Sequence, residues 1–391
     1  MNRRTLLLGA AGLPLAPAVL ARPATAQNAP FRVGLILSMT GPFASTGKQI
    51  EAAVRLYARQ NPAFAGRPVE ILLRDDGGAA DATRRLAQEL VVNERVSALA
   101  GFVLTPHALA AAPIAARGRV PMVVMSAATA TVTEASPFVF RTSQTTPQVT
   151  VPLAGWAAEN GIRKAVTVVS DYGPGLDAEK WFGQRLGSAG GTVAEALRVP
   201  LANPDFAPFL QRARDATPEA VFVFVPAGVG SVFMRQFAER GLKDAGIRLI
   251  ALGDVLDDDI LNGMGDPALG VVSSHHYSAA HDSEANRRFV AAFREAAGMR
   301  PNFMAAGGYD GMTLLRLAAE KAGAGAAGQV LADAMKGLSW ESPRGPVSID
   351  AATRDIVQNV YIRRVERQGG ELYNVEIATV PAVKDPAKAA G

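Results

Sequence analysis

Small hydroxyl-bearing side chains follow several apolar, strand-like runs of this chain. The run Met122–Met125 ends in Ser126–Thr129, which we call the shelf, and a second run ends at Thr105, directly before a proline. Proline favours the first turn of a helix, so Thr105 is expected at a helix N-terminus, where backbone N–H groups favour an anion. A third run ends in "SMTGPFASTG", with hydroxyls around Phe43. These loops predict a site for a carboxylate; plain helix capping by the threonines is the alternative.

Two strand ends further along the chain also carry groups that suit a ligand. The segment "SDYGPG" presents Tyr172, which offers an aromatic face and a hydroxyl. The segment "GDVLDD" presents Asp254, a carboxylate that could pair with an ammonium group. Helix capping is the alternative for Asp254.

Motifs for catalysis, nucleotide binding and metal binding are missing from the sequence. It contains no G-x-S-x-G, no G-x-x-x-x-G-K-[ST], no G-x-G-x-x-G after a strand and no H-E-x-x-H. His275 and His276 are adjacent, so on a strand they point to opposite faces, and we interpret them and His281 as hydrogen-bonded or solvated. Asp257–Asp259 lacks the ligand spacing of a calcium loop and is interpreted as acids at the start of a helix. We expect no metal, no cofactor and no catalytic residue.

The elements that must position these groups alternate regularly. From Phe31 onward, apolar runs of strand length alternate with amphipathic helical stretches, which indicates parallel sheets covered on both faces. The series restarts after "FVFRTS", which predicts an α/β protein with two doubly wound (Rossmann-like) lobes and a cleft at the carboxyl ends of the strands. The predicted division is residues 27–144 plus 277–352 for lobe 1, residues 145–276 plus 353–380 for lobe 2, and a C-terminal tail at 381–391.

The N-terminal 26 residues have the pattern of a secretory signal. They begin with Arg3 and Arg4, continue through a short apolar stretch and end in Ala24-Thr25-Ala26. A twin-arginine or a general secretory route fits equally. Without this segment the chain has 37 basic and 36 acidic residues, so its charge is no argument for nucleic-acid binding. The chain has no cysteine and no later apolar run long enough to span a membrane. We therefore expect an exported, soluble, periplasmic protein.

The ordered segments "LILSMTGPFASTG", "VPMVVMSAATAT", "FVFRTS", "VSDYGPG" and "FMRQFAERGL" resemble the leucine/isoleucine/valine-binding family of type I periplasmic solute-binding proteins, over nearly all of residues 31–377. The resemblance implies two lobes joined by three crossovers that close on one small ligand. It implies that Thr105, Ala127 and Thr129, beside Ser126, hold the carboxylate and part of the ammonium of the ligand. It also implies that Tyr172 contacts the ligand from the second lobe when the lobes close, and that Asp254 binds the ligand's ammonium group.

The sequence departs from the amino-acid binders of that family at two places. Thr105-Pro106-His107 stands where serines are usual, and the proline removes one N–H donor. "FVFVPAG" replaces a Gly/Tyr-rich stretch and is more apolar. With Phe43, Phe303 and Tyr277 as expected pocket residues, these changes favour an aromatic or other hydrophobic carboxylate.

The predicted function is capture of a small carboxylate, either an amino acid or an aromatic acid, by hinge closure and delivery to the membrane permease of an ABC importer. We expect a monomer that binds no nucleic acid. A sensory ligand-binding protein of the same fold that reports to a membrane receptor is the alternative. A secreted enzyme is disfavoured because no nucleophile–base set is present.

Overall fold

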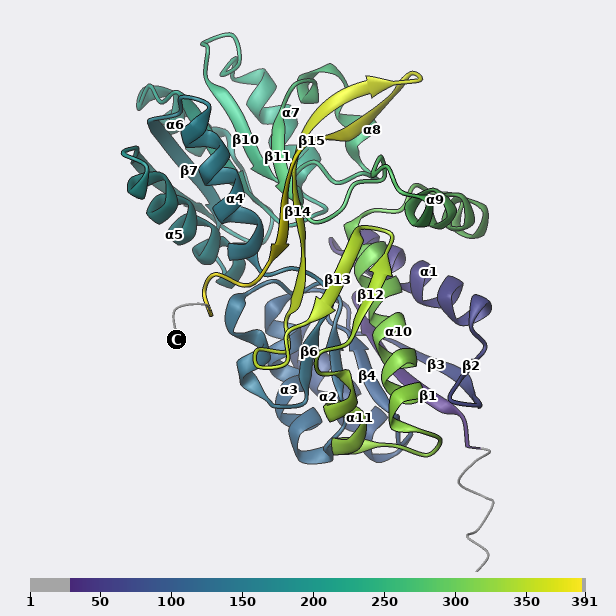
Figure 1. The fold of residues 1–391 in the computed structure, drawn as a ribbon. Coiled ribbons are helices and arrows are strands. Elements are labelled where there is room, and N and C mark those ends of the chain that lie inside the picture. Colours follow the sequence, from purple (N-terminus) through teal and green to yellow (C-terminus); the bar gives the residue numbers. More distant parts are fainter. Residues whose placement is uncertain (1–28, 389–391) are drawn as a thin grey trace, which may run out of the picture.

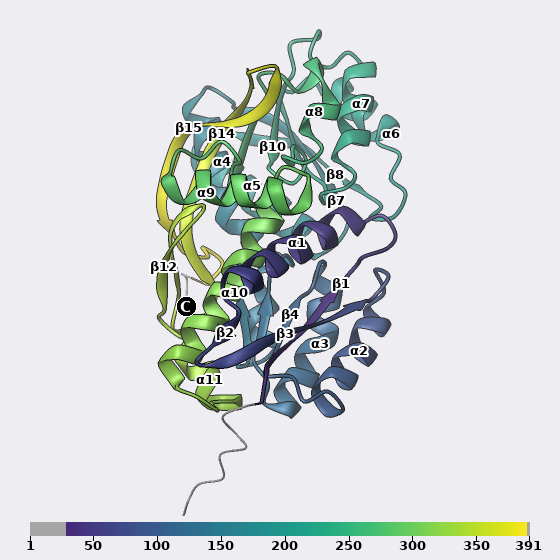
Figure 2. The same ribbon diagram turned by 90° about the vertical axis from the view of Figure 1, so that its right-hand side faces the viewer.

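The computed structural model describes residues 29–388, which form two α/β lobes (Figures 1 and 2). The predicted fold class is confirmed. The signal-like segment 1–26 and the end of the predicted tail lie outside the described residues.

The first lobe is built on a sheet with strand order β2-β3-β1-β4-β5-β6. All neighbours pair in parallel except β2 with β3. Its strands are β1 (Phe31–Leu37), β2 (Ala63–Phe64), β3 (Arg67–Asp75), β4 (Ala98–Gly101), β5 (Met122–Val124) and β6 (Val139–Arg141). Its helices are α1 (Ala44–Gln60), α2 (Ala80–Val92), α3 (Thr105–Gly118), α9 (Glu284–Ala297), α10 (Phe303–Ala322) and α11 (Gly328–Met335).

Alternating side chains of the first-lobe strands pack into two apolar cores, one on each face of the sheet. Val33 and Leu35 pack beneath α1 and α10, whereas Ile36 and Leu99 pack beneath α2 and α3. Burial on both faces explains why the strands read as almost continuous apolar runs.

The second lobe is built on the strand order β12-β13-β14-β11-β10-β9-β7-β8, with β15 paired to β14. Strands β7 to β11 run parallel, and β14 runs antiparallel to β11. Its strands are β7 (Lys164–Ser170), β8 (Thr192–Val199), β9 (Ala220–Phe224), β10 (Arg248–Leu252), β11 (Val272–His275), β12 (Ser339–Ser342), β13 (Gly345–Ile349), β14 (Ile356–Gln368) and β15 (Glu371–Val383). Its helices are α4 (Thr146–Glu159), α5 (Gly173–Ser188), α6 (Ala207–Asp215), α7 (Gly230–Glu239) and α8 (Leu261–Met264).

The chain passes between the lobes at three places, between β6 and α4, between β11 and α9, and between β13 and β14 (Figure 1). The predicted division of the lobes stays a prediction. Strands β12 and β13, which it assigns to lobe 1, hydrogen-bond into the sheet of lobe 2 through β14. Val347 and Ile349 nevertheless pack into the core of lobe 1, so this ribbon belongs to both lobes.

Two helices begin earlier than the sequence pattern indicates. The amphipathic pattern predicts a helix at 312–322, but α10 begins at Phe303, because the side chain of Asn302 accepts hydrogen bonds from the N–H groups of Met304 and Ala305. Glycines interrupt the apolar pattern of its first turns. They are needed for close packing: a Cβ on Gly307 would lie 2.6 Å from the backbone oxygen of Met125, directly after β5. The pattern also predicts a helix around 152–160, but α4 begins at Thr146, after a capping box between Thr145 and Gln148.

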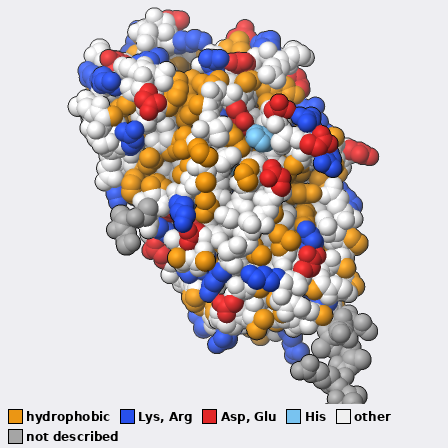
Figure 3. Space-filling model, in the orientation of Figure 1, with side chains coloured by type: hydrophobic (Ala, Val, Ile, Leu, Met, Phe, Trp, Pro, Cys, Tyr) orange, Lys and Arg blue, Asp and Glu red, His pale blue; other side chains and the backbone are white. Residues whose placement is uncertain are grey.

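Acidic and basic side chains are interspersed on the molecular face drawn in Figure 3. This fits the almost equal numbers of the two charge types. Among residues 29–388, no helix is both long and apolar enough to cross a membrane.

Candidate functional site

The carboxyl ends of the strands in both lobes face one cavity, which encloses about 370 Å³ of space that opens partly to solvent. The part of its wall from lobe 1 consists of Phe43, Thr46, Val103, Leu104, Thr105, Ser126, Ala127, Ala128 and Met304. The part from lobe 2 consists of Tyr172, Pro174, Phe224, Pro226, Ala227 and Asp254. Most of this wall is apolar, and its polar groups fall into two sets.

The first polar set is a pair of hydroxyls in lobe 1. Thr105 is the first residue of α3, and its Oγ1 lies 2.8 Å from Oγ1 of Thr129. Neither hydroxyl caps a helix: Leu104 is the N-cap of α3, and Thr129 precedes the short 3₁₀ helix η2 (Ala130–Ala135) without a side-chain capping bond. The capping alternative therefore fails for both residues. Thr105 borders the cavity, whereas Thr129 is not part of its wall and bonds to the hydroxyl of Thr105.

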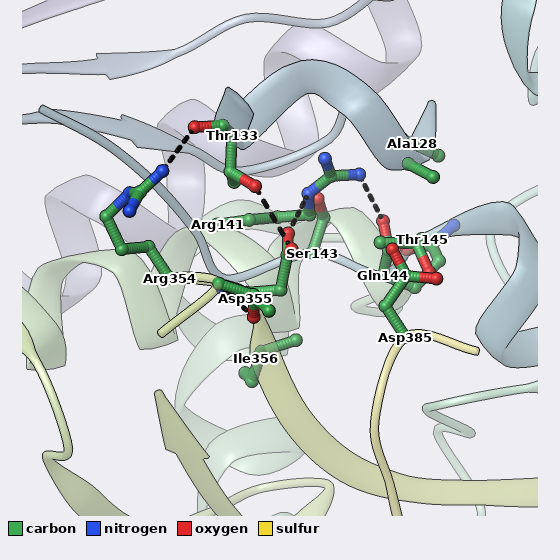
Figure 4. Close-up of polar contacts among 12 residues, drawn as sticks. Ala128, Thr133, Arg141, Ser143, Gln144, Thr145, Arg354, Asp355, Ile356 and Asp385 are labelled. Carbon is green, nitrogen blue, oxygen red and sulfur yellow. Dashed lines mark hydrogen bonds and ion pairs between the residues drawn. The ribbon is translucent and has the colours of Figure 1, made fainter. Parts of the chain in front are cut away.

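A buried arginine orients the backbone of the shelf. The guanidinium of Arg141 donates to the carbonyls of Ala127 at 3.3 Å and Thr129 at 2.8 Å. It also donates to the carbonyl of Gln144 at 3.2 Å and pairs with Asp355 at 3.0 Å (Figure 4). The N–H and C=O of a trans peptide point in opposite directions, so the N–H of Ala128 turns away from Arg141. Within the described chain, the N–H of Ala128 makes no protein hydrogen bond. The shelf thus presents a free donor where anion binding was predicted.

Ser126 borders the cavity, but its hydroxyl is already used. Its Oγ donates to the carbonyl of Val103 at 2.8 Å and is buried. This bond ties the end of β5 to the loop before α3, so Ser126 fixes the distance between the two loops that carry Thr105 and Thr129.

The second polar set belongs to lobe 2. Asp254 follows β10 and is 6% exposed, and its Oδ2 lies 3.3 Å from Nε2 of His275. Burial lowers the pKa of His275 to about 4, so the imidazole is neutral at pH 7 and donates its Nε2–H to the carboxylate. The remaining lone pairs of Asp254 are free to accept from a ligand.

An aromatic pair stands beside Asp254. Tyr172 is the N-cap residue of α5, and its ring lies 6.1 Å from that of Phe224 with an interplanar angle of 11°. Burial, and then the charge of Asp254, raises the pKa of Tyr172 well above its usual value. The phenol therefore stays protonated and can donate or accept a hydrogen bond.

Three of the expected site residues, Thr129, Tyr277 and Phe303, do not border the cavity. Tyr277 is fully buried in the core of lobe 1, with its ring 6.4 Å from that of Phe289. Phe303 is the first residue of α10 and lies against His275, at a ring distance of 4.1 Å. Both follow crossover segments, and their direction depends on how α9 and α10 pack rather than on local sequence.

The histidines and the aspartate run are structural. His275 and His276 are fully buried, with ring centroids 4.5 Å apart, so neither is solvated. Asp257 accepts from Asn302 at 2.7 Å, and Asp258 accepts from Asn374 at 3.2 Å. The interpretation of these acids as a helix start is wrong, because α8 begins at Leu261 without a side-chain cap. No group of three metal-ligating side chains occurs among residues 29–388.

Several wall residues were not singled out from the sequence. Phe224 and Pro226 come from the "FVFVPAG" segment, whose apolar character was the available signal. Met304 carried no such signal, because nothing in its local pattern distinguishes a cavity wall from a core.

Two α/β lobes with a cavity between them at their strand ends define a two-lobed solute-binding protein. The chain matches the family described as "Periplasmic binding protein" over residues 30–371 and belongs to that family. It is 44% identical to "Leu/Ile/Val-binding protein homolog 6" of Brucella melitensis, over 91% of this chain and 93% of the relative. The predicted family and the role as a solute-binding protein of ABC transporters are confirmed.

Solved structures of ABC-transporter solute-binding proteins share the fold. One from Rhodopseudomonas palustris BisB5, in complex with 3,4-dihydroxy benzoic acid, is 57% identical and superposes with a TM-score of 0.90 over 92% of this chain and 99% of that one. Another, from R. palustris HaA2 in complex with p-hydroxybenzoic acid, is 39% identical, with a TM-score of 0.89 over 92% and 100% of the two chains.

Proposed function

We propose that this protein captures a hydroxylated benzoate between its lobes and delivers it to the permease of an ABC importer. The observation that carries the proposal is the buried carboxylate of Asp254, whose partner in lobe 2 is a neutral histidine and which borders a largely apolar cavity. A ligand that fits must bring a hydrogen-bond donor to Asp254 and an anion to the hydroxyls of Thr105 and Thr129. A benzoate with a ring hydroxyl has both groups on a flat, apolar body.

The aromatic walls support a ring as the ligand's body. Tyr172 and Phe224 stack on each other, and Phe43 contributes a third ring from lobe 1. Offset or edge contacts with such rings add roughly 0.5–1.5 kcal/mol to the burial of an aromatic ligand. The 57% identical structure bound to 3,4-dihydroxy benzoic acid supports the same assignment.

A branched-chain amino acid is the second candidate. An ammonium group would also satisfy Asp254, and the 44% identical relative is named as a homologue of the Leu/Ile/Val-binding protein. An amino acid, however, carries its ammonium next to its carboxylate, so one end of the ligand would have to reach polar groups of both lobes.

The proposal includes the cellular setting. The segment 1–26 directs export and is removed, by the twin-arginine or the general route, and the released protein acts in the periplasm as a monomer without catalysing turnover of its ligand. The lobes close on the ligand by bending at the three crossovers, and the permease receives the closed form.

A thermal-shift series on the purified mature protein tests the ligand class. The series compares 3,4-dihydroxybenzoate, 4-hydroxybenzoate, benzoate and leucine. A hydroxybenzoate at about 100 times its Kd should raise the Tm by roughly 5 °C, benzoate should do less, and leucine should do nothing. A shift with leucine and none with the aromatic acids would contradict the proposal.

A further inference from the structure

Gly173, in lobe 2, lies directly against Thr129 of the shelf in lobe 1. A Cβ atom built on Gly173 would stand 2.4 Å from Oγ1, 3.4 Å from Cγ2 and 3.5 Å from Cβ of Thr129. The three atoms nearest to this Cβ position all belong to Thr129. The side chain that would clash with a methyl group on Gly173 therefore belongs to the opposite lobe. Contacts below 3.0 Å are essentially never made by real Cβ atoms.

The backbone of lobe 2 does not itself require glycine at this position. Gly173 is the first residue of α5 and is not among the residues with positive φ, so alanine can adopt its conformation. Gly175 behaves differently, because a Cβ there would stand 1.8 Å from the backbone oxygen of Ser170 within lobe 2. Gly175 serves the strand-to-helix packing of its own lobe, whereas Gly173 serves an approach between lobes.

A second contact joins the same two segments one helical turn further along. The carboxylate of Asp177 accepts a hydrogen bond from the N–H of Ala130 at 3.0 Å. Residues i and i+4 of a helix share a face, so Gly173 and Asp177 face the consecutive residues Thr129 and Ala130. Burial raises the pKa of Asp177, opposed by the Ala130 hydrogen bond and the charges of Arg141 and Lys180.

We propose that Gly173 is the residue that allows α5 to close over the shelf, and that Asp177 fastens this closed contact. Gly173 acts through Thr129 and is therefore a positioning residue for the ligand. Its missing side chain lets the first turn of α5 reach Thr129, so that the carboxylate seated on lobe 1 is covered from lobe 2. This inference rests on the proposed closure of the lobes around a ligand but not on which ligand is bound.

The test compares Gly173→Ala with Gly187→Ala. Gly187 lies on the same helix and has nothing within 4 Å of its Cβ position, so it provides the matched control. In Gly173→Ala the unliganded Tm should stay unchanged, while the affinity for 3,4-dihydroxybenzoate falls about tenfold because the closed state is less populated. Small-angle scattering should show that this variant does not become more compact with saturating ligand, whereas Gly187→Ala does.

A ligand-independent measurement separates this inference from the proposed ligand. Ser45 of lobe 1 donates to Asp259 of lobe 2 at 2.6 Å, and the chain has no cysteine. Ser45→Cys with Asp259→Cys therefore gives a unique interlobe thiol pair, whose reaction with a short bifunctional cross-linker reports closure without ligand. Adding Gly173→Ala should slow cross-linking about tenfold, and adding Gly187→Ala should not.

Each outcome decides the inference. If Gly173→Ala cross-links and binds as the control does, the inference is overturned. If the parent protein ignores hydroxybenzoates while Gly173→Ala still slows cross-linking, the proposed ligand fails and the closing role of Gly173 stands. Asp177→Ala provides a second variant should Gly173→Ala fail to fold; it should release ligand about threefold to tenfold faster, and unchanged release and cross-linking rates would also overturn the inference.

Discussion

Nε2 of His275 lies 3.3 Å from Oδ2 of Asp254, and only Asp254 of this pair borders the cavity. The histidine therefore orients the carboxylate from behind without contacting the ligand. Because its imidazole is neutral at pH 7, it does not cancel the negative charge of Asp254. This charge makes Asp254 a strong acceptor for a hydroxyl or ammonium donor.

Asp254→Asn should separate hydroxylated from unsubstituted ligands. Loss of the charge-assisted bond should weaken 4-hydroxybenzoate binding about tenfold, or roughly 1.4 kcal/mol. Benzoate brings no donor, so its affinity should stay the same or rise. Calorimetric titration of both ligands measures the difference, and an equal loss for both would show that Asp254 does not bind the ring hydroxyl.

Thr129→Val should weaken every carboxylate ligand by about tenfold, because a methyl group replaces a hydroxyl beside the anion. The matched control is Thr131→Val, which changes an exposed threonine two residues further on, in η2. Titration with benzoate suffices here, since that ligand lacks other polar groups. Equal affinity in the two variants would remove Thr129 from the carboxylate site.

Folding stability should fall between pH 6.5 and pH 4. Burial lowers the pKa of His275 from 6.5 to about 4, so in this window the unfolded chain binds a proton that the folded protein does not. Stability contributed by the neutral histidine is present above pH 6.5 and is lost as the pH falls, by up to about 3 kcal/mol. Urea unfolding at pH 7 and pH 4.5 measures this loss in the free energy of unfolding. The free energy of unfolding of His275→Gln should decrease less between these two pH values than that of the parent protein.

Arg141→Met should destabilise the fold by about 3 kcal/mol, because it strands the buried carboxylate of Asp355 and several shelf carbonyls. Lys388, with Nζ 2.5 Å from Asp355, keeps the loss from being larger. The comparison variant is Arg288→Met, whose ion pair with Glu284 is exposed and should contribute little. If the urea midpoints of Arg141→Met and Arg288→Met agree within experimental error, the buried network contributes no more to folding stability than an exposed ion pair.

Much of the fold followed from the sequence because its signals are local. Apolar runs such as Phe31–Leu37 are buried on both sheet faces and end at the cleft, so the rule on strand carboxyl ends placed Thr105, Tyr172 and Asp254 correctly at the cavity wall. Their roles toward a ligand stay predictions.

The misplaced residues depend on contacts between distant segments. Phe303 and Tyr277 are aromatic and close to crossovers, but their directions follow from the packing of α9 and α10. Glycines that serve packing, such as Gly307, look like helix breakers in the sequence. Arg141 stands in the quoted segment "FVFRTS", but its role could not be inferred from the sequence, because its partners Ala127, Thr129 and Asp355 are distributed over two distant stretches of the chain.

The bonds of Arg141 have a consequence for the order of events during binding. One guanidinium connects the shelf to Asp355, which directly precedes β14 at a crossover. Within the proposed closure, this connection attaches the proposed anion site to one end of the hinge, so the site should keep its shape when lobe 2 moves away. We then expect the association rate to depend mainly on lobe 1, and the difference between solutes to appear in their dissociation rates.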